Sequence, residues 1–349
     1  MIGWIDMKKL LNTLYVTTQG SYLSQSGETV LIRVEKETKL RVPIHTLDSI
    51  ICFGQVSCSP PLMQLCAERN VTISFLSYYG KFQARVVGPV SGNVLLRREQ
   101  YRQADDEDKS VSIAKSIVLA KISNCRTVLQ RGLRSQSSIN EKSKIENAVS
   151  ILKFIIDKVY KSDSLKILRG YEGEAARKYF EVFDNLIIVQ KKDFYFKERT
   201  RRPPLDNMNA LLSFLYTLCV HDLTSSLESV GLDPAVGFFH QDRPGRPGLA
   251  LDLVEEFRPY LADRLALTLV NRQQIKGNGF KKTESGGVIM DDKTRKEVLT
   301  AYQKRKYDEI QHPFLNEKIS VGLLPYSQTL LLSRYLRGDI DGYPPFFWR

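Results

Sequence analysis

The chain has 349 residues, about two domains' worth of sequence, and 42% of them are hydrophobic, which is enough to build ordinary cores. Its 51 lysines and arginines exceed its 39 aspartates and glutamates, so the formal net charge of +12 indicates attraction to a polyanion such as nucleic acid. The longest apolar runs are far shorter than the ~20 residues that cross a bilayer, and the start of the chain lacks the apolar segment of a secretory signal, so we expect a cytoplasmic protein without a membrane segment.

The first part of the chain has the composition of β-strands. Residues 1–6 are given no role, and a short helix that opens with proline is expected at 61–69. Glycine-containing turns are expected at 19–20, 26–27 and 79–80. Runs of β-branched and aromatic residues predict strands at 29–34, 49–53, 71–75 and 82–87. These elements predict a β-rich N-terminal domain over residues 1–100.

The hydrophobic period changes to that of helices after residue 101. Apolar residues form one stripe from Ala114 to Leu129 and another from Ile145 to Val159, which predicts an antiparallel helical hairpin with a loop at 135–140. The acidic run at 105–108 is expected to cap the first of these helices. Residues 206–230 are apolar on most faces and predict a central buried helix.

Nearly every segment as far as residue 337 is expected to be helical. The predicted fold class is therefore α+β, with the β-rich domain followed by a larger all-helical domain over residues 101–349. The ending at 339–342 is a poor match to a calcium loop and is expected to be a polar tail.

Cysteines and most histidines receive no chemical role. The five cysteines lack the spacing of a disulfide framework or of a zinc site, so reduced and mostly buried thiols are expected. His221 is expected to be structural, and His45 and His312 lie beside proline-containing turns without carboxylates at useful spacing, so neither is a candidate ligand.

Three side chains able to bind a metal stand out in the second half of the chain. Glu172 lies between two glycines just before a predicted helix, and His240 follows two phenylalanines. Glu255 lies on a predicted helix on which Asp252 shares a face with both Glu255 and Glu256, so that like charges repel unless a cation lies among them. Two carboxylates and one imidazole suit Mg²⁺ or Mn²⁺.

Each of these residues also has an ordinary structural interpretation. Glu172 could be a first-turn glutamate favoured by the helix dipole, and Glu255 could pair with Arg258 on a solvated face. His240 could be a buried, hydrogen-bonded histidine. Glu174 and Glu256 are acidic neighbours that could serve as alternates.

Four stretches together resemble the CRISPR-associated adaptation endonuclease family, the integrases that insert new spacers into CRISPR arrays. The resemblance runs nearly from end to end, and its order and spacing are specific. The stretches begin at Gly170, Arg201, Gly231 and Leu249, and they read GYEGEAA, RRPPLDNMNALLSFLY, GLDPAVGFFH and LALDLVEEFRP. Residues 277–290 and 335–346 look most like subtype I-C.

The resemblance implies both a site and a reaction. The family's metal ligands fall on Glu172, His240 and Glu255, and Asp252 lies one helical turn from Glu255 and could support them. Some members carry aspartate where this chain has Glu255, a conservative difference that leaves the assignment intact. The implied enzyme is a metal-dependent DNA endonuclease and integrase of antiviral defence, in which a 3′-hydroxyl attacks a phosphodiester bond.

The resemblance also implies partners. The double-stranded DNA substrates are the spacer precursor and the CRISPR repeat, and the β-rich half is expected to form a homodimer and to dock a small CRISPR-associated subunit. Basic clusters flank the proposed metal site, and the candidates for DNA-backbone contacts are Arg201, Arg202, Arg243 and Arg246. Two alternatives stay open: a nucleic-acid-binding module without catalysis, and a metal-dependent repair nuclease that cleaves DNA without joining it.

Overall fold

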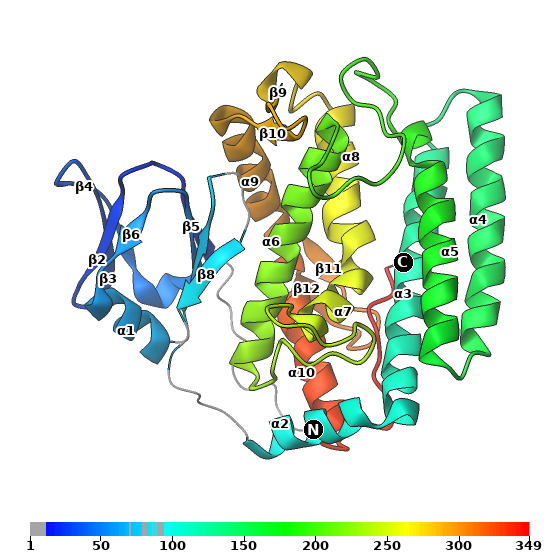
Figure 1. The fold of residues 1–349 in the computed structure, drawn as a ribbon, viewed down its shortest axis with the longest axis horizontal. Helices are drawn as coiled ribbons and strands as arrows, with labels where there is room; N and C mark the ends of the chain where they lie inside the picture. The colour runs from blue at the N-terminus through cyan, green and yellow to red at the C-terminus, as the bar shows by residue number, and fades with distance from the viewer. Residues whose placement is uncertain (1–11, 70, 79–81, 87, 89–93, 349) are drawn as a thin grey trace. The chain divides into compact units, whose positions relative to one another are not determined.

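In a computed structural model of the chain, the described residues are 12–69, 71–78, 82–86, 88 and 94–348 (Figure 1). The segment 1–6 and the turn expected at 79–80 lie outside this part. Contacts between Cα atoms divide the chain into two compact units. The β unit comprises residues up to 92 together with 299–310 and 319–324, and the helical unit comprises 93–298, 311–318 and 325–349.

The β unit contains two four-stranded sheets. One has the order β1-β5-β7-β8, with the first three strands parallel and β8 antiparallel to β7, and the other has the order β4-β3-β2-β6. The strands are β1 (Asn12–Val16), β2 (Tyr22–Ser26), β3 (Thr29–Val34), β4 (Glu37–Pro43), β5 (Leu47–Phe53), β6 (Ser57–Cys58), β7 (Thr72–Leu76) and β8 (Phe82–Val86). The four predicted strands are confirmed as β3, β5, β7 and β8. The sequence analysis did not single out β1, β2, β4 or β6.

One hydrophobic core joins the two sheets and helix α1 (Pro60–Glu68), which was predicted within one residue at each end. Ser59 caps this helix by accepting a hydrogen bond from the Leu62 backbone, and prolines occupy its first positions. Burial raises the pKa of the core thiols Cys52 and Cys66 to about 12, which keeps them protonated at neutral pH. All five cysteines are free.

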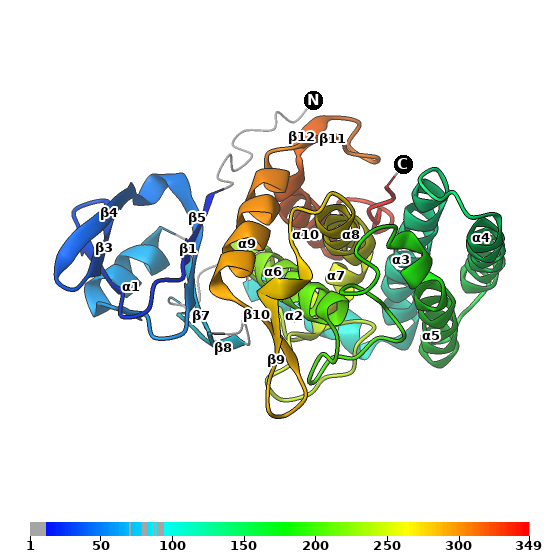
Figure 2. The same cartoon turned by 90° about the horizontal axis from the view of Figure 1, so that it is seen from above.

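Long helices form most of the helical unit. They are α2 (Val94–Asp105), α3 (Glu107–Leu133), α4 (Ile139–Tyr160), α5 (Leu165–Glu181), α6 (Asn207–Ser229), α7 (Gly248–Phe257), α8 (Arg264–Asn271) and α10 (Leu324–Leu336), while α9 (Asp292–Lys306) is divided between the two units at residue 299. The predicted hairpin is confirmed as α3 and α4, which lie beside α5 in both ribbon views (Figures 1 and 2). Asp106 caps α3 by accepting from the Lys109 backbone at 3.0 Å, as the acidic run predicted.

Helix α6 is the predicted central helix of this unit. It buries residues on every face, as the consecutive buried residues 208–212 and 221–225 show. By length and composition alone it is the single helix in the described part of the chain that could span a membrane, but 72% of its apolar window is buried inside the structure. A mostly buried apolar helix of this kind is typical of the centre of a folded unit.

The helical unit differs from the sequence-based expectation in three ways. Short strands form two hairpin-like pairs in the last third of the chain, β9 (Phe280–Lys282) with β10 (Val288–Met290) in the helical unit, and β11 (Glu309–Gln311) with β12 (Lys318–Ser320) at residues divided between the two units. These strands have three residues each, too few to show a period in the sequence. Irregular segments at 187–206 and 231–247 also interrupt the helices. The boundary expected at residue 100 falls inside α2, and parts of the last third of the chain belong to the β unit.

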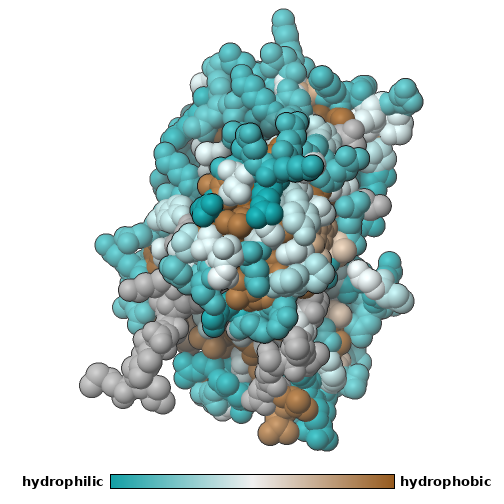
Figure 3. Space-filling view, turned by 90° about the vertical axis from the view of Figure 1, so that its left-hand side faces the viewer, coloured by the Kyte–Doolittle hydropathy of each residue, from teal (hydrophilic) through white to brown (hydrophobic). Residues whose placement is uncertain are grey.

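The surface agrees with the charged composition. On the face seen from the left-hand side of Figure 1, hydrophilic side chains predominate and apolar ones form only scattered patches (Figure 3). Charged residues make up 26% of the chain, which accounts for this coverage.

Candidate metal centre

Glu172 lies in the middle of α5, which begins at Leu165, seven residues earlier than Glu172. The first-turn interpretation of Glu172 is therefore wrong, because the dipole effect is confined to the first turn of a helix. The flanking residues Gly170 and Gly173 have open space where a Cβ atom would lie. Glycine inside a helix costs about 1 kcal/mol relative to alanine, so local stability does not explain this pair.

His240 lies within the irregular segment 231–247 and is held by the carboxylate of Asp252 on α7. Oδ1 of Asp252 lies 2.6 Å from Nδ1 of His240 and also accepts the His240 backbone N–H at 2.9 Å. Oδ2 of Asp252 accepts the backbone N–H groups of Phe238 and Phe239. This segment packs so tightly that a Cβ atom on Gly237 would lie 2.7 Å from Oδ2 of Asp252. Asp252 therefore fixes the imidazole through Nδ1, and Nε2 makes no hydrogen bond within the described residues.

Glu255 lies on α7 and is 5% exposed in its side chain. It forms ion pairs with Arg258, one turn further along, and with Nζ of Lys121, which is 2.6 Å from Oε2 of Glu255. Burial opposes the charge on Glu255, but the two positive neighbours outweigh it and lower the pKa of this carboxyl to about 2. The expected pairing with Arg258 is present, but on a buried face rather than on a solvated one.

Nζ of Lys121 also pairs with Oε1 of Glu172, so one ammonium joins α5 to α7. Lys121 projects from α3, and all three side chains are largely withdrawn from solvent, with exposures of 12% for Lys121, 23% for Glu172 and 5% for Glu255. The fold therefore brings the two predicted carboxylates to a single cation.

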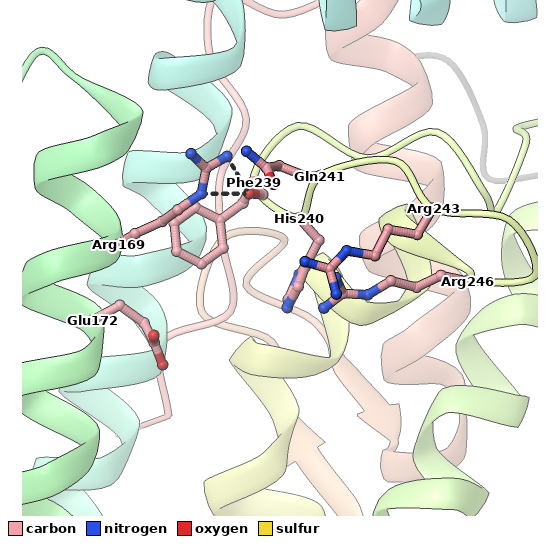
Figure 4. A pocket seen from close by; sticks show the side chains of 7 residues that line it. All are labelled: Arg169, Glu172, Phe239, His240, Gln241, Arg243 and Arg246. Carbon is pink, nitrogen blue, oxygen red and sulfur yellow. Dashed lines mark hydrogen bonds between the residues drawn. The ribbon is translucent and has the colours of Figure 1, made fainter.

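A pocket of about 330 Å³ opens beside Glu172 and His240 (Figure 4). Its other charged lining residues are all basic: Arg169, Arg243 and Arg246. Figure 4 shows His240, Arg243 and Arg246 on one side of the pocket and Glu172 on the other. Arg169 donates hydrogen bonds to the carbonyl oxygen of Phe239, which ties α5 to the segment that carries His240.

The four candidates for DNA contacts separate into two places. Arg243 and Arg246 line the pocket, whereas Arg201 and Arg202 are exposed on the other irregular segment. That segment is tied to β10 by a hydrogen bond from the backbone N–H of Val288 to Pro204.

The structure separates the ligand candidates from their acidic alternates. Glu174 lies two residues beyond Glu172 and so points roughly 200° away around the helix. Glu256 is fully buried, and its carboxylate accepts hydrogen bonds from Gln328, from the Tyr343 hydroxyl and from the Phe346 backbone. Burial raises the pKa of Glu256 to about 7. Neither alternate shares the cation that joins Glu172 to Glu255.

The residues fit a hard divalent cation by their chemistry. In the described part of the chain, no three His, Cys, Asp or Glu side chains are grouped closely enough to hold a metal ion as they stand. Glu172 and Glu255 nevertheless share one cation, and Oε2 of Glu255 is buried and accepts no hydrogen bond of good geometry from a described residue. Two ionised carboxylates that converge on one cation offer the oxygen ligands that Mg²⁺ or Mn²⁺ prefers.

Lys121 and Arg169 were missed by the sequence analysis. Lys121 lies three residues after Val118 and four before Cys125, on the apolar stripe of α3, so a lysine on a buried face was the available signal. No comparable signal marks Arg169, because its contact with Phe239 joins residues 70 positions apart.

Comparison with known proteins shows which family this chain resembles. The family model for CRISPR associated protein Cas1 matches residues 14–304. A relative from Chlorobaculum tepidum, named CRISPR-associated endonuclease Cas1 1, is 53% identical over 98% of this chain and 100% of its own length.

Solved structures show the same fold at lower identity. A casposase bound to its integration product matches with a TM-score of 0.81 at 22% identity, over 97% of this chain and 94% of its own. A chain of a Cas6-RT-Cas1–Cas2 complex matches with a TM-score of 0.81 at 21% identity, and this protein covers 37% of that longer chain. Both likenesses concern the fold as a whole.

Proposed function

Because the chain belongs to the Cas1 family of CRISPR-associated endonucleases, we propose that Glu172, His240 and Glu255 hold the divalent metal ion with which it acts on DNA. The observation that carries this proposal is the single ammonium shared by Glu172 and Glu255, beside a pocket that Glu172 and His240 line together. Asp252 is the proposed positioning residue, since it orients the imidazole as second-layer carboxylates do in metal sites.

The protein is a DNA endonuclease and integrase of CRISPR spacer acquisition. In the joining reaction the 3′-hydroxyl of the incoming spacer attacks a phosphorus atom of the repeat. A new phosphodiester bond forms, the bond from phosphorus to the repeat's own 3′-oxygen breaks, and that oxygen leaves as a 3′-hydroxyl. When water replaces the spacer hydroxyl, the same displacement is a cleavage.

The proposed metal and the arginines have different tasks. When bound, Mg²⁺ or Mn²⁺ neutralises charge that develops on the phosphate and activates the attacking oxygen. Arg243 and Arg246 supply positive charge at the pocket and are proposed to hold the DNA backbone without reading its sequence. Arg201 and Arg202 are exposed and are proposed to contact the duplex farther along. Arg258 keeps Glu255 ionised.

Partners and subtype complete the proposal. We propose that double-stranded DNA and a Cas2-like small subunit are the partners, because the similar solved complex contains Cas2. Homodimer formation and subunit docking by the β unit rest on the family resemblance. Subtype I-C rests on residues 277–290 and 335–346, and a cytoplasmic location rests on the five free cysteines, which are typical of reducing compartments.

A strand-joining assay tests the proposed centre. The protein and its small partner would be incubated with a labelled duplex bearing free 3′-hydroxyls and a supercoiled plasmid that carries a CRISPR repeat, in Mn²⁺, in Mg²⁺ or in EDTA. Covalent transfer of label to the plasmid is expected with the wild-type protein in metal. It is expected to be lost in EDTA and in Glu172→Ala and His240→Ala.

The matched control is Glu174→Ala, which removes an acidic residue from the same helix and should retain joining. Cleavage without joining would favour a plain repair nuclease. DNA binding with neither reaction in any metal would leave a binding module without catalysis. Joining that survives Glu172→Ala would overturn the ligand assignment while leaving the family activity intact.

A further inference from the structure

Lys121 presents a positive charge at the point where the two proposed carboxylate ligands meet. Its ammonium pairs with Oε1 of Glu172 and, at 2.6 Å, with Oε2 of Glu255. The three side chains come from three different helices, α3, α5 and α7. No other described residue is paired with both carboxylates.

The charges around this lysine balance. Glu172 and Glu255 supply two negative charges, and Lys121 and Arg258 supply two positive ones. Burial disfavours the charge on Lys121, but the carboxylates of Glu255 and Glu172 outweigh it and raise the pKa of the ammonium. Without this ammonium, two weakly solvated carboxylates would repel one another across a short gap.

We propose that Lys121 is an internal cation that holds Glu172 and Glu255 together and that a hard divalent cation must displace from their oxygens. This inference rests on the proposed function, because it assigns the same two carboxylates to the metal. A carboxylate oxygen that binds the ammonium is less available to a second cation, so the lysine organises the ligands and competes for them. Its stem has four rotatable carbons, which allow the ammonium to move aside.

If Lys121 competes with the metal, its replacement should strengthen Mn²⁺ binding, whereas the replacement of a lysine that only positions the ligands should weaken it. Lys121→Met keeps the length of the side chain but removes the charge. Releasing the oxygens from the ammonium is expected to tighten Mn²⁺ binding on the order of tenfold, which corresponds to about 1.4 kcal/mol. If the lysine served only to position the ligands, its loss would weaken Mn²⁺ binding.

Two measurements without DNA test the inference. The first is the Mn²⁺ dissociation constant, from titration calorimetry or from the electron paramagnetic resonance signal of free Mn²⁺. The second is the thermal unfolding midpoint in EDTA and in saturating Mn²⁺. Lys121→Met is expected to have a lower midpoint than wild type in EDTA and a larger rise on adding Mn²⁺. Lys115→Met removes the same charge from the same helix and should behave as wild type.

The outcomes separate this inference from the proposed function. Tighter Mn²⁺ binding by Lys121→Met, with Lys115→Met unchanged, supports the displacement. Unchanged or weaker binding by a folded Lys121→Met overturns it, provided that Glu172→Ala still abolishes Mn²⁺ binding. If Glu172→Ala and His240→Ala bind Mn²⁺ as wild type does, the proposed centre itself fails. Should Lys121→Met not fold, Lys121→Gln keeps a hydrogen-bond donor, removes the charge and carries the same expectation.

Discussion

Asp252 is the residue on which the geometry of the proposed centre depends most directly. It accepts three backbone N–H groups and contacts Nδ1 of His240, and it is fully buried. The sequence placed it on the same face as Glu255 and Glu256, where like charges would repel. In the structure each of the three carboxylates has its own donors, so the repulsion is offset locally.

Asp252→Asn is expected to weaken the proposed centre without changing a ligand. Replacing one carboxylate oxygen by an amide N–H opposes the donors that converge on this side chain, so the imidazole loses its fixed orientation. Mn²⁺ affinity and strand joining should fall by roughly 10- to 100-fold. Asp242→Asn, an exposed change in the adjacent segment, serves as the control. Full joining activity in Asp252→Asn would contradict the positioning role.

Asp263 is a second buried carboxyl, and it has a measurable pH signature. It accepts hydrogen bonds from the hydroxyls of Tyr179 and Tyr216, and burial raises its pKa from 3.8 to about 6. The native state therefore holds this proton at pH values where the unfolded chain has released it. The free energy of unfolding should fall by about 3 kcal/mol as pH rises from about 4 to 6.

Asp263→Asn should remove this part of the pH dependence, because the amide keeps an acceptor for the tyrosines and does not titrate. Urea unfolding of both proteins at a series of pH values between about 4 and 7 measures the difference. Curves that stay parallel across this range would show that Asp263 keeps an ordinary pKa.

At the scale of elements, helix α7 places two adjacent glutamates in different environments. Glu255 points to Lys121 and Arg258, while Glu256 points to the C-terminal segment 343–348. Successive residues of a helix differ by 100°, so neighbours in sequence meet different helices. The segment 343–348 follows the expected polar tail, and it buries Phe346 completely.

Asn124, on α3, connects this C-terminal segment to α3 and α7 through hydrogen bonds. Its amide donates to the carbonyl oxygens of Glu256 and Phe346, each at 2.8 Å, and accepts from the backbone N–H of Trp348 at 2.8 Å. Asn124→Ala removes three hydrogen bonds to backbone groups and should reduce the free energy of unfolding by about 3 kcal/mol. Ser123→Ala, on the adjacent position, should have little effect.

Urea unfolding measures the loss, and hydrogen exchange at the Trp348 amide locates it. Faster exchange at this amide in Asn124→Ala than in wild type is the expected local result. An unchanged exchange rate would mean that the ring contacts of Trp348 with Tyr260, Arg131 and Arg264 hold the segment by themselves.

At the scale of the whole molecule, the net charge of +12 gives binding to DNA a salt dependence. Each phosphate contact that is lost should reduce the slope of log K against log salt by about 1. Arg243→Ala and Arg246→Ala should each have this effect, since both line the pocket. Lys39→Ala, an exposed lysine of the β unit, serves as the control. Titrations of a labelled duplex at several salt concentrations would refute the assignment if all slopes were equal.

The sequence by itself determined the elements with strong local periods and the chemistry of the ligand set. The amphipathic stripes of α3 and α4, the apolar length of α6 and the strands β3, β5, β7 and β8 follow from side-chain patterns within a few turns or residues. Glu172, His240 and Glu255 could be chosen because carboxylates and imidazole are the groups that bind hard cations, and the family resemblance gave their order.

Only the tertiary structure decided how these residues meet. Lys121 and Glu172 are 51 positions apart, and no local period links them. The burial of the C-terminal segment, the contact of Arg169 with Phe239 and the different environments of Glu255 and Glu256 likewise depend on which helices pack together. The period of a sequence shows which residues of one helix or strand share a face. It does not show which helices pack together, and that packing determines a site whose residues come from three helices distant in the chain.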